Sequence, residues 1–148
     1  MTTVEASVEI DAPPERVWEI TSDPRNLPHW DRHIERVWLP SAGLGRGARY
    51  SVRMRFLAVR SDVQAEVLEW EPPWLAKFRL VGILNATVTT SIASLPFERS
   101  LLRHEVEYSF RGALGRFAAK SLAAVGGAHL GLRHGIAAQK REIESATR

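Results

Sequence analysis

The segments that decide the fold of this chain are VEASVEI at residues 4–10, DAPPERVW at 11–18 and DPRNLPHW at 23–30. Apolar and polar residues alternate through 4–10, which predicts a strand with one buried and one exposed face. Pro13 and Pro14 fit the first turn of a helix, where a missing N–H removes no hydrogen bond. We expect this helix to end near residues 21–24 and a second short helix to lead to Trp30. A strand followed by two short helices points to one architecture more than to any chemistry.

Composition predicts one ordinary globular domain spanning residues 1–148. The absence of cysteine excludes disulfides, thiolate chemistry, Cys-ligated zinc and iron–sulfur clusters. The formal charge is +3, but the basic residues are spread beside acidic ones, so we expect a mixed-charge surface and no nucleic-acid binding. No apolar run reaches the roughly 18 residues of a membrane span. Glu5 and Glu9 in the first strand argue against a signal peptide. The absence of cysteine fits a cytoplasmic protein, which is the location we expect.

Six further strands are predicted, at residues 32–39, 49–56, 62–70, 76–81, 86–94 and 102–111. The last of them alternates most regularly, and a one-residue slip would bury four charges, so its register is well specified. From Ala113 onward, apolar residues recur at three- and four-residue steps, which predicts a long C-terminal helix with a potential break near Gly126-Gly127.

This order of elements, together with APPERVW at 12–18, EWEPP at 69–73 and FRG at 110–112, resembles the START-like superfamily, most closely its polyketide cyclase/dehydrase branch. The resemblance covers essentially the whole chain. It implies an α+β helix-grip fold, in which a seven-stranded antiparallel sheet is wrapped around the long C-terminal helix. It also implies a cavity between sheet and helix, flanked by the two short helices. No catalytic motif common to the family can be carried over.

The inward faces of the strands supply the candidate ligand-binding residues, because a bent sheet and one helix leave a volume that bulky side chains must line. These residues are Tyr50, Met54, Phe56, Phe78, Leu80, His104, Val106, Tyr108 and Phe110, with Phe117 and Val125 from the C-terminal helix. Each could instead be an ordinary core residue. His104 and Tyr108 are the catalytic candidates, because an imidazole titrates near neutrality and either side chain could present a polar tip to a ligand. His104 could instead be a core histidine with satisfied hydrogen bonds.

Other chemistries find little support in the sequence. His33, His129 and His134 lack the spacing of metal ligands, so we expect no metal and no cofactor. We expect His29 at the surface and Arg79 on the outward face of its strand. There is no Gly-x-Ser-x-Gly motif and no pair of buried carboxylates, which disfavours nucleophilic and glycosidase chemistry.

Three functions remain open at this stage. The first is a binding protein for a small hydrophobic molecule such as a lipid, polyketide or isoprenoid, and we favour it because it needs only the cavity. The second is a polyketide cyclase, aromatase or dehydratase acting in that cavity. The third is an interaction protein, which would show an exposed apolar patch. The sequence leaves both a monomer and a homodimer open.

Overall fold

The computed structural model describes residues 1–56, 58–124 and 127–147. Within these ranges the strands form one antiparallel sheet in the order β1-β7-β6-β5-β4-β3-β2. The strands are β1 (Thr2–Ile10), β2 (Ile34–Trp38), β3 (Arg49–Phe56), β4 (Val59–Glu71), β5 (Leu75–Val81), β6 (Leu84–Leu95) and β7 (Arg99–Phe110). The helices are α1 (Pro14–Thr21), the 3-10 turn η1 (Pro24–Asn26), α2 (Leu27–Trp30), α3 (Gly112–Ala124) and α4 (Gly127–Thr147). Every predicted strand is present, with ends that differ by at most three residues.

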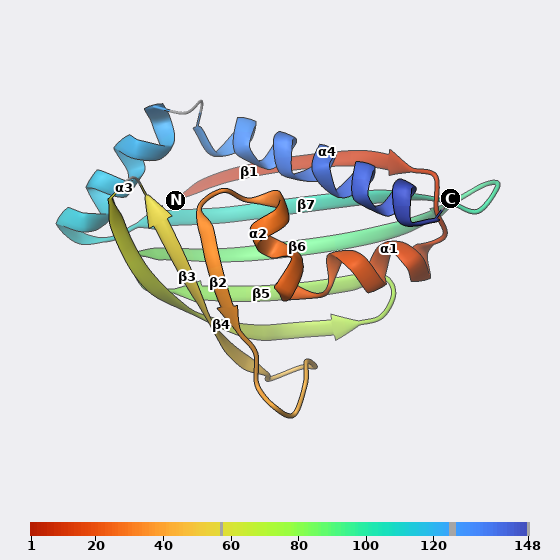
Figure 1. Ribbon diagram of the computed structural model, residues 1–148, viewed down its shortest axis with the longest axis horizontal. Coiled ribbons are helices and arrows are strands. Elements are labelled where there is room, and N and C mark those ends of the chain that lie inside the picture. Colours follow the sequence, from red (N-terminus) through yellow and green to blue (C-terminus); the bar gives the residue numbers. More distant parts are fainter. Residues whose placement is uncertain (57, 125–126, 148) are drawn as a thin grey trace.

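The sheet is strongly bent, and α4 runs along its concave side beside β1, as Figure 1 shows. The short helices α1 and α2 lie next to α4 on the same side of the sheet. This arrangement confirms the predicted helix-grip fold. It also places three helices where they can enclose a space against the sheet.

Alternation along β7 separates the buried and exposed faces of the sheet. Leu102 and His104 are buried, whereas Arg103 between them is exposed and forms ion pairs with Glu5 and Glu105. A shift of one residue would place that arginine in the core, which explains why the pattern specified the register.

Two tryptophan side chains hold the short helices α1 and α2 in place. Pro14 begins α1, and Trp18 of that helix packs edge-on against Trp70, with 4.9 Å between ring centroids. At the end of α2, Trp30 is buried and its Nε1–H donates to Glu142 Oε2 at 2.6 Å. This hydrogen bond joins α2 to α4.

Within the described residues, the C-terminal region contains α3 and α4, and glycines account for the start of α4 and for its close packing. Gly127, the first residue of α4, has a φ of 81°, in the left-handed region that favours glycine. Gly126, the other residue of the predicted break, lies outside the described residues. At Gly135, an added Cβ would lie 3.2 Å from the backbone oxygen of Trp30, so glycine allows α4 to approach α2 closely.

The apolar core is divided into two clusters at opposite parts of the sheet. One contains side chains of β1, α1, β7 and α4, including Ile10, Val17 and Leu102. The other contains side chains of β3, β4 and β6, including Tyr50, Met54 and Val63. Trp70 and Phe78 contact both clusters. The cavity described below is lined mainly by the cluster that contains Tyr50, Met54 and Val63.

Candidate ligand pocket

A cavity of about 280 Å³ lies between the concave side of the sheet, α2 and α4. Its walls are mostly apolar, which is typical of sites for small hydrophobic molecules. Its volume is close to the lower end of the usual range for ligand pockets, about 300–1,000 Å³.

The structure brings together most of the residues that the sequence selected. Those that line the cavity are Tyr50, Met54, Phe56, Phe78, Leu80, His104, Val106, Tyr108 and Phe110. Phe117 is not among the lining residues, because it lies on the outer side of α3 with 43% of its surface exposed. Val125 lies outside the described residues.

His104 is held between the sheet and α4 by both of its ring nitrogens. Its Nε2 lies 2.6 Å from Gln139 Oε1, and its Nδ1 lies 2.8 Å from Thr90 Oγ1. An amide oxygen can only accept, so Nε2 carries the proton and Nδ1 accepts the hydrogen bond from the Thr90 hydroxyl. In the neutral ring, both nitrogens are therefore hydrogen-bonded within the protein.

Burial keeps His104 neutral. Loss of solvation lowers the pKa of this ring below its ordinary value, and the hydrogen bond to Gln139 offsets that effect only in part. With no free nitrogen, His104 offers a ligand mainly the face and carbon edge of its ring. The geometry thus matches the alternative of a satisfied core histidine, although the side chain does line the cavity.

Tyr50 and Tyr108 are the hydroxyl-bearing aromatic residues of the cavity wall. Neither hydroxyl hydrogen-bonds to another residue within the described ranges. Burial raises the pKa of Tyr50, so its phenol stays protonated and can donate a hydrogen bond. Tyr108 packs edge-on against Phe110, with 5.8 Å between ring centroids. Both hydroxyls are therefore available to a polar atom of a bound molecule.

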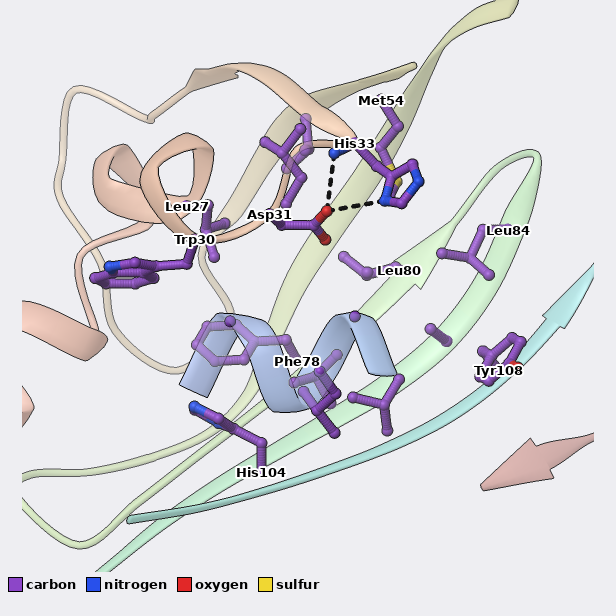
Figure 2. A pocket seen from close by; sticks show the side chains of 18 of the residues that line it. Leu27, Trp30, Asp31, His33, Met54, Phe78, Leu80, Leu84, His104 and Tyr108 are labelled. Carbon is purple, nitrogen blue, oxygen red and sulfur yellow. Dashed lines mark hydrogen bonds and ion pairs between the residues drawn. The ribbon is translucent and has the colours of Figure 1, made fainter. Parts of the chain in front are cut away.

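Asp31 and His33 also line the cavity, and the sequence analysis did not select them. His33 Nδ1 lies 3.1 Å from Asp31 Oδ1, and the same oxygen accepts the backbone N–H of His33 at 2.8 Å. The His33 ring stacks on Phe56, with 5.0 Å between centroids. Figure 2 shows this pair on the opposite side of the cavity from His104. An Asp-x-His motif directly after the second short helix was the available signal.

The remaining candidates lie away from the cavity. Arg79 is exposed on the outer face of the sheet, where its Nη2 lies 3.1 Å from Glu66 Oε1. His29 is exposed, as predicted, and its Nδ1 lies 3.5 Å from Glu142 Oε1. In the part of the chain that the structure describes, no group of His, Asp and Glu side chains is arranged to hold a metal ion. No helix in that part is long and apolar enough to cross a membrane.

Comparison with known proteins identifies a family and a set of similar folds. A sequence model of the family described as polyketide cyclase/dehydrase and lipid transport matches residues 1–144. No curated protein shows a significant sequence match. Similar solved structures include the Zhui aromatase/cyclase from a Streptomyces species, which is 18% identical with a TM-score of 0.78 over 99% of this chain and 96% of that chain.

Two further structures extend the comparison. A protein from Thermus thermophilus is 17% identical with a TM-score of 0.76, over 99% of this chain and 100% of its own. A START superfamily protein from Mycobacterium smegmatis is 16% identical with a TM-score of 0.69, over 97% of this chain and 98% of its own. At these identities the likeness shows the fold alone.

Proposed function

The chain belongs to the polyketide cyclase/dehydrase and lipid transport family, and from that premise we propose that it binds one small, mainly apolar molecule between the sheet and α4. The supporting observation is the cavity, whose wall is mostly apolar. The hydroxyls of Tyr50 and Tyr108 have no partner among the described residues. The expected ligand is therefore a lipid-, polyketide- or isoprenoid-like molecule that carries one or two oxygens.

The ligand-binding proposal is tested by filling the cavity. Ala86 is buried in the cavity wall on β6, between Leu80 and Tyr108 of the neighbouring strands. A tryptophan at this position would occupy the space that a ligand needs. Ala93 lies on the same strand but is exposed, so Ala93→Trp is a matched control.

The measurement is fluorescence titration with the neutral apolar probe N-phenylnaphthylamine. We expect wild type and Ala93→Trp to bind the probe alike, and Ala86→Trp to lose at least tenfold in affinity while its circular dichroism stays native. Equal binding by a folded Ala86→Trp variant, or no binding by wild type, would refute the proposal.

The second candidate function is catalysis in the same cavity, as a polyketide cyclase, aromatase or dehydratase. It is favoured by the similarity of fold to a protein named as an aromatase/cyclase. The catalytic candidates from the sequence are His104 and Tyr108. The test is turnover of a polyketide-like chain by His104→Ala and Tyr108→Phe. Loss of turnover with retained binding supports a catalytic role, and unchanged turnover in both variants rejects it.

Three other statements stay predictions from the sequence. They are the assignment of residues 1–148 to one domain, the cytoplasmic location and a homodimer as the alternative to a monomer, between which the sequence does not decide. Size-exclusion chromatography with light scattering checks the last of these directly.

A further inference from the structure

Asp31 and His33 form a side-chain pair at the cavity that the two candidate functions have not used. Asp31 ends α2 and turns the chain toward β2, and its Oδ1 accepts the backbone N–H of His33 at 2.8 Å. The same oxygen lies 3.1 Å from His33 Nδ1. The His33 ring is fixed on its other side by Phe56, and only 15% of the side chain is exposed.

This geometry determines which ring nitrogen carries the proton. A carboxylate can only accept hydrogen bonds, so Nδ1 of His33 must be the protonated nitrogen. In a neutral imidazole the lone pair then lies on Nε2. Within the described ranges, Nε2 of His33 makes no hydrogen bond. The residue lines the cavity, as Figure 2 shows, and Nε2 is the ring nitrogen that remains for a bound molecule.

The two histidines of the cavity therefore differ in tautomer and in availability. His104 is protonated at Nε2 and uses both nitrogens within the protein. His33 is protonated at Nδ1 and keeps Nε2 free. An imidazole held through Nδ1 by a carboxylate, with Nε2 left for a substrate, is one arrangement that supports general-base catalysis.

We propose that Asp31 and His33 form a proton-accepting pair, in which His33 Nε2 removes a proton from an apolar ligand that carries an acidic C–H beside a carbonyl group or a phenolic O–H. This inference rests on the proposed binding function and names the chemistry of its ligand. His33 is the catalytic residue, because it touches the reacting atom. Asp31 is a positioning residue that acts through His33.

The step conserves atoms and charge without any further reactant. The C–H bond of the ligand breaks, its electron pair forms an enolate, and the proton goes to Nε2. The resulting imidazolium is balanced by the Asp31 carboxylate at Nδ1. Return of the proton to the enolate regenerates neutral His33.

The tautomers are tested first, because this measurement needs no ligand. Long-range ¹H–¹⁵N correlation spectra of the neutral rings distinguish a protonated Nδ1 from a protonated Nε2. We expect His33 in the Nδ1–H form and His104 in the Nε2–H form, with the signals assigned by His33→Gln and His104→Gln. A His33 ring in the Nε2–H form would overturn the proposal.

Proton removal is then tested with β-tetralone, an apolar bicyclic ketone with an acidic CH₂ group. In D₂O, His33 would take a proton from that carbon, exchange it with solvent and return deuterium, which ¹H NMR follows. We expect wild type to accelerate this exchange and His33→Gln to lose about 100-fold of that acceleration. His134→Gln is the matched control, because His134 is exposed and outside the cavity lining.

Asp31→Asn separates the electrostatic role of Asp31 from its role in the turn. The asparagine Oδ1 can still accept both N–H groups, so the turn and the ring orientation are retained while the charge is lost. We expect a lower exchange rate at saturating β-tetralone with unchanged binding affinity. A purely structural Asp31 predicts no change in that rate.

Failure of this inference is distinguishable from failure of the binding proposal. If β-tetralone binds but His33→Gln exchanges deuterium as fast as wild type, the proton-accepting pair is refuted and ligand binding stands. If neither β-tetralone nor N-phenylnaphthylamine binds to wild type, the binding function is refuted and the inference falls with it.

Discussion

Gln139→Leu is the substitution that most directly tests the hydrogen-bonded link between the sheet and α4. Gln139 Oε1 accepts from His104 Nε2 at 2.6 Å, and both residues are buried. Leucine removes the only acceptor that the described residues give this nitrogen. A change of tautomer would not help, because the imidazole would then bond Thr90 through a protonated Nδ1 and leave Nε2 as an unpaired acceptor.

The expected loss follows from leaving one buried polar atom without a partner. Such a loss lowers the free energy of unfolding by about 1–3 kcal/mol. For a chain of this size, that corresponds to a Tm lower by roughly 3–10 °C. Urea unfolding and differential scanning calorimetry measure both quantities. The control is Gln64→Leu at an exposed position of β4, where the change should stay within about 0.5 kcal/mol.

A double-mutant cycle isolates the interaction from the effect of adding an apolar side chain. His104→Phe combined with Gln139→Leu removes both hydrogen-bonding partners, so the double variant should be more stable than the sum of the single losses predicts. We expect a coupling free energy of about 1–2 kcal/mol. A coupling near zero, or a Gln139→Leu variant as stable as wild type, would refute the assignment of this hydrogen bond.

Three further predictions concern stability. Burial lowers the pKa of His104 from 6.5, so below that pH the unfolded chain gains a proton that the folded chain does not. The free energy of unfolding should therefore fall by up to about 1.4 kcal/mol for each pH unit below 6.5. Urea titrations at different pH values measure this dependence, and His104→Phe should lack the part that His104 contributes. The Cβ added by Gly131→Ala would lie in open space, so this variant should stabilise α4 by about 1 kcal/mol. The Cβ added by Gly135→Ala would lie 3.2 Å from the backbone oxygen of Trp30, so this variant should not stabilise α4. Equal gains in Tm for the two variants would contradict the close approach of α4 to α2. Trp30→Phe removes the hydrogen bond to Glu142, and faster deuterium exchange of the α2 amides should report it, while unchanged exchange would count against this bond as the link to α4.

Most of the fold was predictable because it depends on periodic patterns. The alternation along β7 leaves one register that buries Leu102 and exposes Arg103, and the prolines at 13 and 14 mark where α1 begins. Periodicity predicts which face of its own helix or strand a side chain occupies. It does not predict where the last helices lie relative to the sheet. Phe117 shows this, because its apolar character suggested a wall position whereas α3 turns it outward.

The candidate site was predictable only where it lies on strands. Parity alone placed His104 in the wall, but its partners come from β6 and α4, and no local pattern pairs Thr90 and Gln139 with one ring. Asp31 and His33 lie in the turn after α2, where no period applies and the contact depends on backbone geometry. From the sequence, His104 is a catalytic candidate and His33 is considered only as a metal ligand, so the hydrogen bonds of the two rings could not be compared. Their tautomers, set by a carboxylate for one and an amide oxygen for the other, leave a free lone pair on His33 alone of the two.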